Sequence, residues 1–177
     1  MLGYTNYTSY LSLGKQSLAE HRKLLAATIS REESVTQIVS RSVLWLASST
    51  GVIQTWQKVE YSFGYELESE SYDVVATDGG IEIRMGRPRL IAKPAVTDLK
   101  YEILQGGLIT DEKAAVLRLY EAASKRAADQ GEALASDAAV VALCEKQLIL
   151  FLSDFLAKQP GVRTIPAIKV VHRTDRT

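Results

Sequence analysis

The stretch LASSTGVIQTWQKVEYSFGYELE, residues 46–68, changes its hydrophobic period part of the way along. Ahead of it, apolar residues recur at helical spacing, and from Val59 to Leu67 they alternate with polar ones. A period near 3.6 residues indicates a helix, and a period of 2 indicates a strand with one buried face. Glycine tolerates the left-handed conformation that closes many helices, so Gly51 predicts the helix end. The stretch therefore predicts a helix followed by a strand.

Upstream of this stretch, the pattern predicts two helices. Residues 9–29 have helix-forming composition. Ser30 and Glu33 have the spacing of a capping box, in which each side chain satisfies a backbone amide of the first turn. An apolar stripe at helical spacing follows, made of Val35, Ile38, Val39, Val43 and Leu46. We expect a second helix from about residue 30 to Gly51.

Downstream, the sequence predicts a small antiparallel meander over about residues 55–93. Asp78–Gly80 suits a tight hairpin turn, and Gly86–Pro88 suits a second turn. The chain is then expected to return to helix, with Thr97 as the cap of a short turn that reaches the glycines at 106–107.

Two longer helices are predicted after that, from Thr110 to about Gln130 and from Ser136 to Gln159. Residues 160–161, Pro-Gly, end the last helix, and the remaining residues show no helical period. We therefore expect an α+β fold that is mostly a helical bundle, with a small antiparallel β-meander. It would form a single domain over 1–161, followed by an extended C-terminal arm over 162–177.

Composition limits the classes of function. The chain has 177 residues with 21 Lys+Arg and 21 Asp+Glu, so it has no overall attraction for nucleic acid or for an anionic membrane. The longest run of large apolar residues, LILFL at 148–152, is far shorter than the roughly 20 residues of a bilayer span. The start of the chain lacks the pattern of a secretory signal. We expect synthesis in the cytoplasm and no membrane contact.

Residues that could carry catalysis are sparse. Cys144 shares a helical face with apolar residues and reads as a small buried hydrophobe. His21 and His172 lie near opposite ends of the chain and in no metal-ligand spacing. Glu66, Glu68 and Glu70 would hold a hard cation only if the strand continued through them, and a solvated strand face is the commoner reading. We expect no enzyme activity, no metal and no cofactor.

The charge pattern is the most distinctive feature of the chain. Residues 60–82 hold seven acidic residues and no Lys or Arg, whereas residues 83–101 hold five basic residues against one acidic residue. Residues 163–177 add four basic residues against one acidic residue. Ordinary surface charge explains this pattern. So does a head-to-tail contact between subunits, which closes into a ring when the rotation permits. The interface residues would be Glu66, Glu68, Glu70, Arg84, Arg87 and Arg89.

Two segments resemble the head–tail connector, or adaptor, proteins of tailed bacteriophages. They are LWLASSTGVIQTWQKVEYSF and GIEIRMGRPRLIAKPAVTDLKY, and the resemblance covers about residues 35–101. In that family a helix with a Thr-Gly end leads to a Thr-Trp or Thr-Tyr strand, followed by an apolar strand and a proline-marked turn. The matching positions are Thr50, Gly51, Thr55, Trp56, Ile81, Ile83, Pro88 and Val96. The second half of the chain departs from the family pattern.

The resemblance implies a structural virion protein of the neck, assembled in the host cytoplasm as a homo-oligomeric ring below the portal. It implies contacts with the portal and with other neck or tail proteins, and only transient contact with DNA in the channel. The C-terminal arm would dock onto the portal. The docking residues would be Ile165, Ile168, Lys169, Val170, Val171 and Arg173.

Two other functions remain open from the sequence. The expected order of helices and sheet also suits the coat protein of a helical, nucleic-acid-containing rod, in which Arg84, Arg87, Arg89 and Lys93 would hold phosphates. A small hydrolase or metal enzyme would depend on the carboxylates at 66–70.

Overall fold

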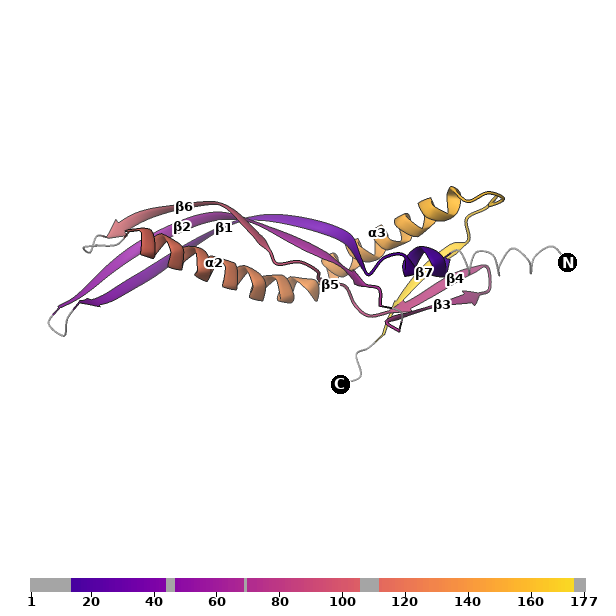
Figure 1. The fold of residues 1–177 in the computed structure, drawn as a ribbon, viewed down its shortest axis with the longest axis horizontal. Coiled ribbons are helices and arrows are strands. Elements are labelled where there is room, and N and C mark those ends of the chain that lie inside the picture. The colour runs from indigo at the N-terminus through magenta and orange to yellow at the C-terminus, as the bar shows by residue number, and fades with distance from the viewer. Residues whose placement is uncertain (1–13, 44–46, 69, 106–111, 174–177) are drawn as a thin grey trace. The chain divides into compact units, whose positions relative to one another are not determined.

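The computed structural model describes residues 14–43, 47–68, 70–105 and 112–173, without the side chains at 37–43, 47–50, 105 and 112–115 (Figure 1). Residues 14–19 are helical. The elements that follow are β1 (Lys23–Val43), β2 (Ala47–Glu66), β3 (Tyr72–Thr77), β4 (Gly80–Met85), β5 (Arg89–Leu90), β6 (Ala95–Gln105), α2 (Glu112–Ala135), α3 (Ala138–Ala157) and β7 (Ala167–His172).

The fold is rich in sheet, so the expected mostly helical bundle is wrong. Residues predicted as the end of one helix and most of the next form β1, a strand of 21 residues. Gly51 lies inside β2, a strand of 20 residues, and ends no helix. Thr97 lies in β6 rather than at a helix cap. The stripe position Leu46 and the predicted helix start at Thr110 lie outside the described residues.

The strands form two sheets. In the first, β2 lies between β1 and β6 and also pairs with β5; in the second, β4 lies between β3 and β7. The alternation from Val59 to Leu67 correctly predicted the later part of β2. The hairpin at Asp78–Gly79 is also confirmed, because Thr77 of β3 pairs with Gly80 of β4 and Gly79 has a φ of 92°. The sheet extends past the predicted limit at residue 93, since β6 runs to Gln105.

The chain forms two compact units. Unit 1 comprises residues 1–28, 62–92 and 132–177, and unit 2 comprises residues 29–61 and 93–131. The predicted boundary between domain and arm at residue 161 therefore lies within unit 1. The part of the predicted arm that the structure describes belongs to unit 1.

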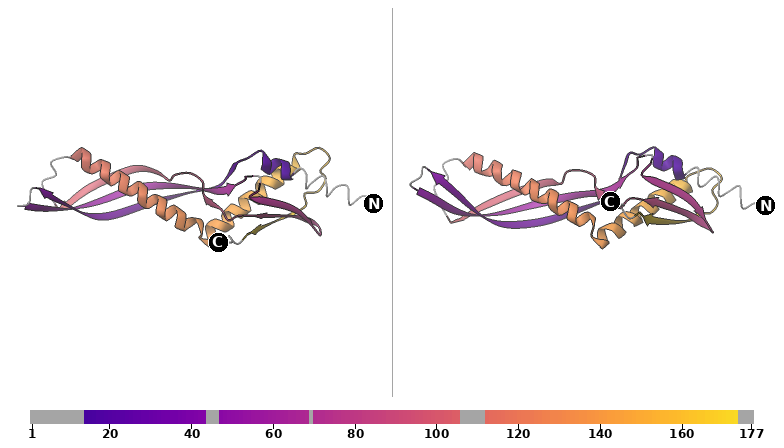
Figure 2. Two further views of the ribbon diagram at one scale, coloured as in Figure 1. Left: turned by 60° about the horizontal axis from the view of Figure 1, so that its bottom comes forward. Right: turned by 90° about the horizontal axis from the view of Figure 1, so that it is seen from below.

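The core of unit 2 is thin. Figure 1 and Figure 2 show α2 lying along β1, β2 and β6, with the strands side by side. The described α2 residues that are buried within unit 2 recur every fourth position and are mostly small: Leu119, Ala123, Ala127 and Gly131. Small side chains at this spacing let a helix backbone approach a sheet closely. The facing side of β2 mixes apolar and polar side chains, which are Ile53, Thr55, Gln57, Val59 and Tyr61.

The core of unit 1 is more apolar. The buried stripe of α3 consists of Val140, Cys144, Leu148, Leu152 and Leu156, and α3 packs against β7. The sheet side supplies the fully buried Phe63, Tyr65, Ile81, Ile83 and Met85. Each such side chain contributes roughly 1.5–3 kcal/mol when buried. Both C-terminal helices were predicted within a few residues of their observed bounds.

Candidate functional site

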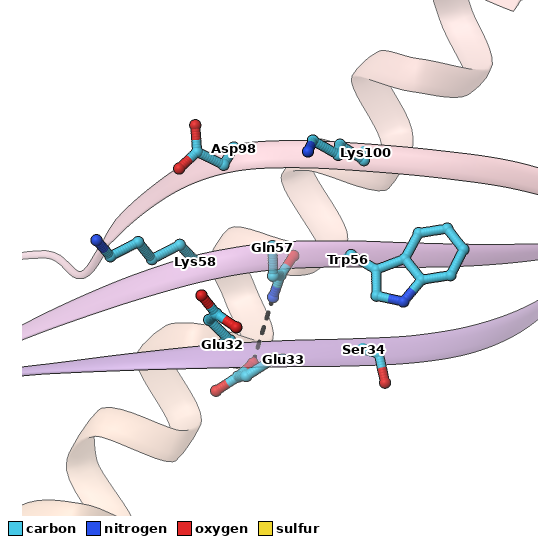
Figure 3. A pocket seen from close by; sticks show the side chains of 8 residues that line it. All are labelled: Glu32, Glu33, Ser34, Trp56, Gln57, Lys58, Asp98 and Lys100. Atoms are coloured by element: carbon cyan, nitrogen blue, oxygen red, sulfur yellow. Dashed lines mark hydrogen bonds between the residues drawn. The ribbon is translucent and has the colours of Figure 1, made fainter.

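A hollow in unit 2 lies where β1, β2 and β6 run side by side (Figure 3). It is an open groove of about 540 Å³. Trp56 and Lys58 face outward because the alternation of β2 buries Thr55, Gln57 and Val59 on the side of α2. The residues that line the groove are Glu32, Glu33, Ser34, Trp56, Gln57, Lys58, Asp98 and Lys100.

A β-bulge shapes the groove. Trp56 pairs with Lys100, but Lys58 pairs with Thr97, so β6 has one more residue than β2 across this step. Asp98 takes up the extra length with a φ of 53°, the only positive φ among the described residues other than glycine. For an L-residue this conformation costs about 1 kcal/mol, and Asp is among the residues that tolerate it best. Asp98 lines the groove together with Lys58 and Lys100 (Figure 3).

The chemistry of the groove is that of a binding surface. Trp56 is 37% exposed and offers an aromatic face. Among the described residues, neither Lys58 nor Lys100 forms an ion pair, so both amines are available to an anionic group. Neither histidine nor cysteine lines the groove. The one hydroxyl that lines the groove, on Ser34, is exposed.

A polar network lies under the sheet of unit 2. The Tyr61 hydroxyl lies 2.9 Å from Glu33 Oε1 and 3.1 Å from Gln130 Oε1, and its single proton is donated to one of them at a time. Gln57 Nε2 donates to Glu33 Oε2 at 3.3 Å, while Gln57 Oε1 is buried without a partner. Burial, and then the hydrogen bond to Glu33, raise the pKa of Tyr61 to about 12. The network ties β1, β2 and α2 together.

Sequence reasoning missed this network. The spacing of Ser30 and Glu33 was interpreted as a helix cap, whereas Glu33 is an acceptor for side chains of β2. A signal for the network was available in the sequence. Gln57 and Tyr61 alternate with polar residues on the side of the strand that also carries Val59, which is the buried side, and buried polar side chains need hydrogen-bond partners.

The predicted interface charges lie in unit 1, and several pair within the chain. Arg89 Nη1 lies 4.0 Å from Glu66 Oε2, and both side chains are about half exposed, so the contact stabilises little. Arg84 donates to Glu82 at 2.7 Å, which lowers the pKa of Glu82. Glu68, Glu70 and Arg87 are exposed. The structure brings Glu66 and Arg89 together and leaves a contact between subunits untested.

The predicted docking arm contains a strand. Residues 167–172 form β7, which pairs in parallel with β4, so Ile168 stands opposite Ile81 and Val171 opposite Arg84. Val170 is 7% exposed, and Ile165, ahead of the strand, is 42% exposed. Lys169 Nζ lies 3.8 Å from Glu82 Oε2, and Arg173 pairs with Asp73. These residues are thus held by sheet contacts, and the basic residue at 176 lies outside the described residues.

Unit 1 holds a part-buried pair that the sequence did not indicate. The rings of Tyr65 and His172 stack at 6.1 Å, and the Tyr65 hydroxyl lies 3.3 Å from His172 Nε2. Burial is the main cause that raises the pKa of Tyr65 and lowers that of His172. Cys144 is fully buried, as predicted, and burial raises the pKa of its thiol to about 11. Such a thiol is a poor nucleophile.

The outer side of α3 carries apolar side chains as well. Leu143 and Leu150 are 38% and 45% exposed, although the opposite side of the helix is buried. A shallow hollow of about 260 Å³ lies here, lined by Ala142, Glu145, Lys146, Ile149 and Leu150.

Within the described residues, no group of three or more His, Cys, Asp or Glu side chains is placed to hold a metal ion. The described helices include none with the length and apolar character needed to cross a membrane. No protein-family model, curated protein or solved structure matches the chain significantly.

Proposed function

We propose that this protein is a structural subunit that assembles with copies of itself and carries out no catalysis. The observation that carries the proposal is the sheet of unit 2, in which β1 and β6 each have β2 as their one strand neighbour among the described residues. The outer edge of such a strand presents unpaired backbone N–H and C=O groups to another chain. The outward Trp56 and the unpaired lysines of the groove add side-chain contacts beside these edges.

The narrower role that we propose is the ring of a bacteriophage head–tail connector, in the neck of the virion. Its support is the resemblance over residues 35–101. The helical bundle that this resemblance implied is not the fold, so the support is confined to the sequence. In this role the partners are further copies of the chain, the portal, and other neck or tail proteins, while DNA passes through without lasting contact.

The coat protein of a nucleic-acid-containing rod is less well supported. It required a basic cluster free to hold phosphates, but Arg84 pairs with Glu82 and Arg89 approaches Glu66 within the same chain. Because each pair neutralises a charge, less of the cluster is left for phosphates.

Native mass spectrometry of the purified chain tests the proposal, with the ratio of absorbance at 260 and 280 nm recorded on the same sample. We expect one closed oligomer free of nucleic acid. A monomer at every concentration would contradict self-assembly. A polydisperse polymer that carries nucleic acid would contradict the connector and support the rod coat protein.

A further inference from the structure

Apart from the two-residue β5, the outer strands of the two sheets differ in how well their edges are protected. In unit 1, β3 and β7 are edge strands of six residues each. In unit 2, β6 has 11 residues, and the part of β1 that belongs to this unit runs from residue 29 to Val43. Short edges offer few backbone groups to a neighbour. The two edges of unit 2 are therefore the ones to compare.

The edge of β6 is blunted. Its pairing with β2 is interrupted twice, at the bulge of Asp98 and near Ile103. Asp98 takes up a left-handed conformation, and the Val96 carbonyl accepts a hydrogen bond from the Tyr120 hydroxyl at 3.5 Å. Bulges and charged side chains are the usual means by which edge strands avoid pairing with another chain. A neighbour would find no regular ladder on β6.

The backbone of β1 differs from that of β6. Residues 29–43 contain neither proline nor glycine, and none of them has a positive φ. Six of them are β-branched, which favours strand pairing. These are Ile29, Val35, Thr36, Ile38, Val39 and Val43. The same residues include two arginines and two glutamates, so another strand can pair here only in a register that places opposite charges together.

We propose that β1 pairs in antiparallel fashion with β1 of a second copy, about a two-fold axis normal to the sheet. This inference rests on the proposed self-assembly and names the surface that performs it. The three strands of unit 2 in each copy then form one continuous sheet. A two-fold contact of this kind is self-complementary, so any closed assembly that uses it has an even number of copies.

The charges on β1 select the register. In a two-fold antiparallel pair one residue stands opposite itself, and the positions on either side oppose each other reciprocally. Centring the pair on residue 37 places Glu33 opposite position 41, which is an arginine, twice per dimer. Centring it on residue 36 would instead place the arginines at 31 and 41 opposite each other, and like charges are unfavourable there.

Glu33 already belongs to a network of side-chain contacts. Its two carboxylate oxygens lie 3.3 Å from Gln57 Nε2 and 2.9 Å from the Tyr61 hydroxyl. An arginine of the second copy would join this network as a charged donor.

Disulfide trapping tests the register. In the Gln37→Cys variant, the introduced thiol stands opposite its own copy, at a Cα separation of about 4.5–5.5 Å that a disulfide spans. We expect mild oxidation to convert most of this variant to a covalent dimer. Thr36→Cys is the matched control. In this register position 36 stands opposite position 38 of the second copy, so the two introduced thiols are displaced along the strands and the variant should form little covalent dimer. The natural Cys144 is buried, so the wild-type chain supplies the background.

Charge reversal provides a second readout on the unmodified backbone. Arg41→Glu places two acidic pairs opposite each other in the dimer and should weaken self-association about tenfold or more in sedimentation equilibrium. Position 31 stands opposite position 43, a valine, in this register. Arg31→Glu should therefore change the self-association constant less than about threefold. An oligomer that resists Arg41→Glu and does not form the residue-37 disulfide overturns β1 pairing but leaves the proposed function standing. A wild-type chain that stays monomeric at all concentrations overturns both.

Discussion

At the scale of single residues, Gly64 shows why one position near the end of β2 needs glycine. A Cβ atom at position 64 would lie 1.9 Å from the carbonyl oxygen of Leu24, far inside any tolerated contact. We expect Gly64→Ala to lower the free energy of unfolding by about 1–3 kcal/mol, because backbone atoms must separate to admit the methyl group. Chemical denaturation measures this loss. Gly86→Ala is the control, since nothing lies within 4 Å of its added Cβ, and a change within about 0.5 kcal/mol is expected.

Tyr61 makes the stability of the fold depend on alkaline pH. Its pKa is raised from 10.0 to about 12, so the folded state favours the protonated phenol. The stability that this provides is fully present below pH 10 and is lost as the pH rises towards 12. The buried thiol of Cys144 acts in the same direction from pH 9 to about 11. We expect the thermal midpoint of the wild-type chain to fall steadily above pH 9.

Two variants isolate the contribution of Tyr61 to this fall. Tyr61→Phe should flatten the loss of thermal midpoint between pH 10 and 12, while lowering stability at neutral pH because Glu33 loses a donor. Thr55→Val is matched to it, because it changes a buried polar residue on the same strand without removing a titrating group. A Tyr61→Phe variant with the same slope as Thr55→Val would contradict this role. Circular dichroism melts across the pH series provide the measurement.

At the scale of elements, residues 30–43 show where sequence reasoning failed. The apolar positions 35, 38, 39 and 43 fit a helical stripe, and the structure nevertheless forms a strand there. Three of these positions are valine and one is isoleucine, whose branched side chains lose rotamer freedom in a helix. Their strand preference, together with pairing to β2, outweighs the period. A stripe made of leucine or alanine at the same spacing would have been better support for a helix.

The elements that were predicted correctly have signals that do not depend on distant partners. The second half of β2 alternates strictly, the β3–β4 turn contains Asp-Gly, and α3 is capped by Asp137, whose carboxylate accepts from the Ala139 amide at 2.8 Å. By contrast, the groove is lined by residues from three distant parts of the chain, 32–34, 56–58 and 98–100. The bulge that shapes it has no local sequence signature. These features follow from tertiary pairing and could not be predicted from local pattern.

At the scale of the whole molecule, the division into two units changes what the C-terminal residues are expected to do. Residues 162–177 were predicted to be an extended arm that docks onto the portal. The structure instead places β7 in unit 1, where it pairs with β4 along six positions and buries Val170. The amide of Arg173 also donates to the Met85 carbonyl at 2.7 Å. Their removal should therefore act on the folding of unit 1.

Truncation after residue 161 tests this assignment. It removes β7, which belongs to unit 1 alone, so only unit 1 should lose stability. We expect hydrogen exchange to accelerate in β3 and β4, whose sheet loses a strand, while β6 and the first turns of α2 keep their protection. Truncation after residue 173 keeps β7 and should preserve protection in both units. If β1 of unit 2 carries self-assembly, the oligomer should survive the longer truncation as well. If hydrogen exchange in β3 and β4 is unchanged after truncation at residue 161, β7 is dispensable for the fold of unit 1. The C-terminal residues would then be free to act as the docking arm.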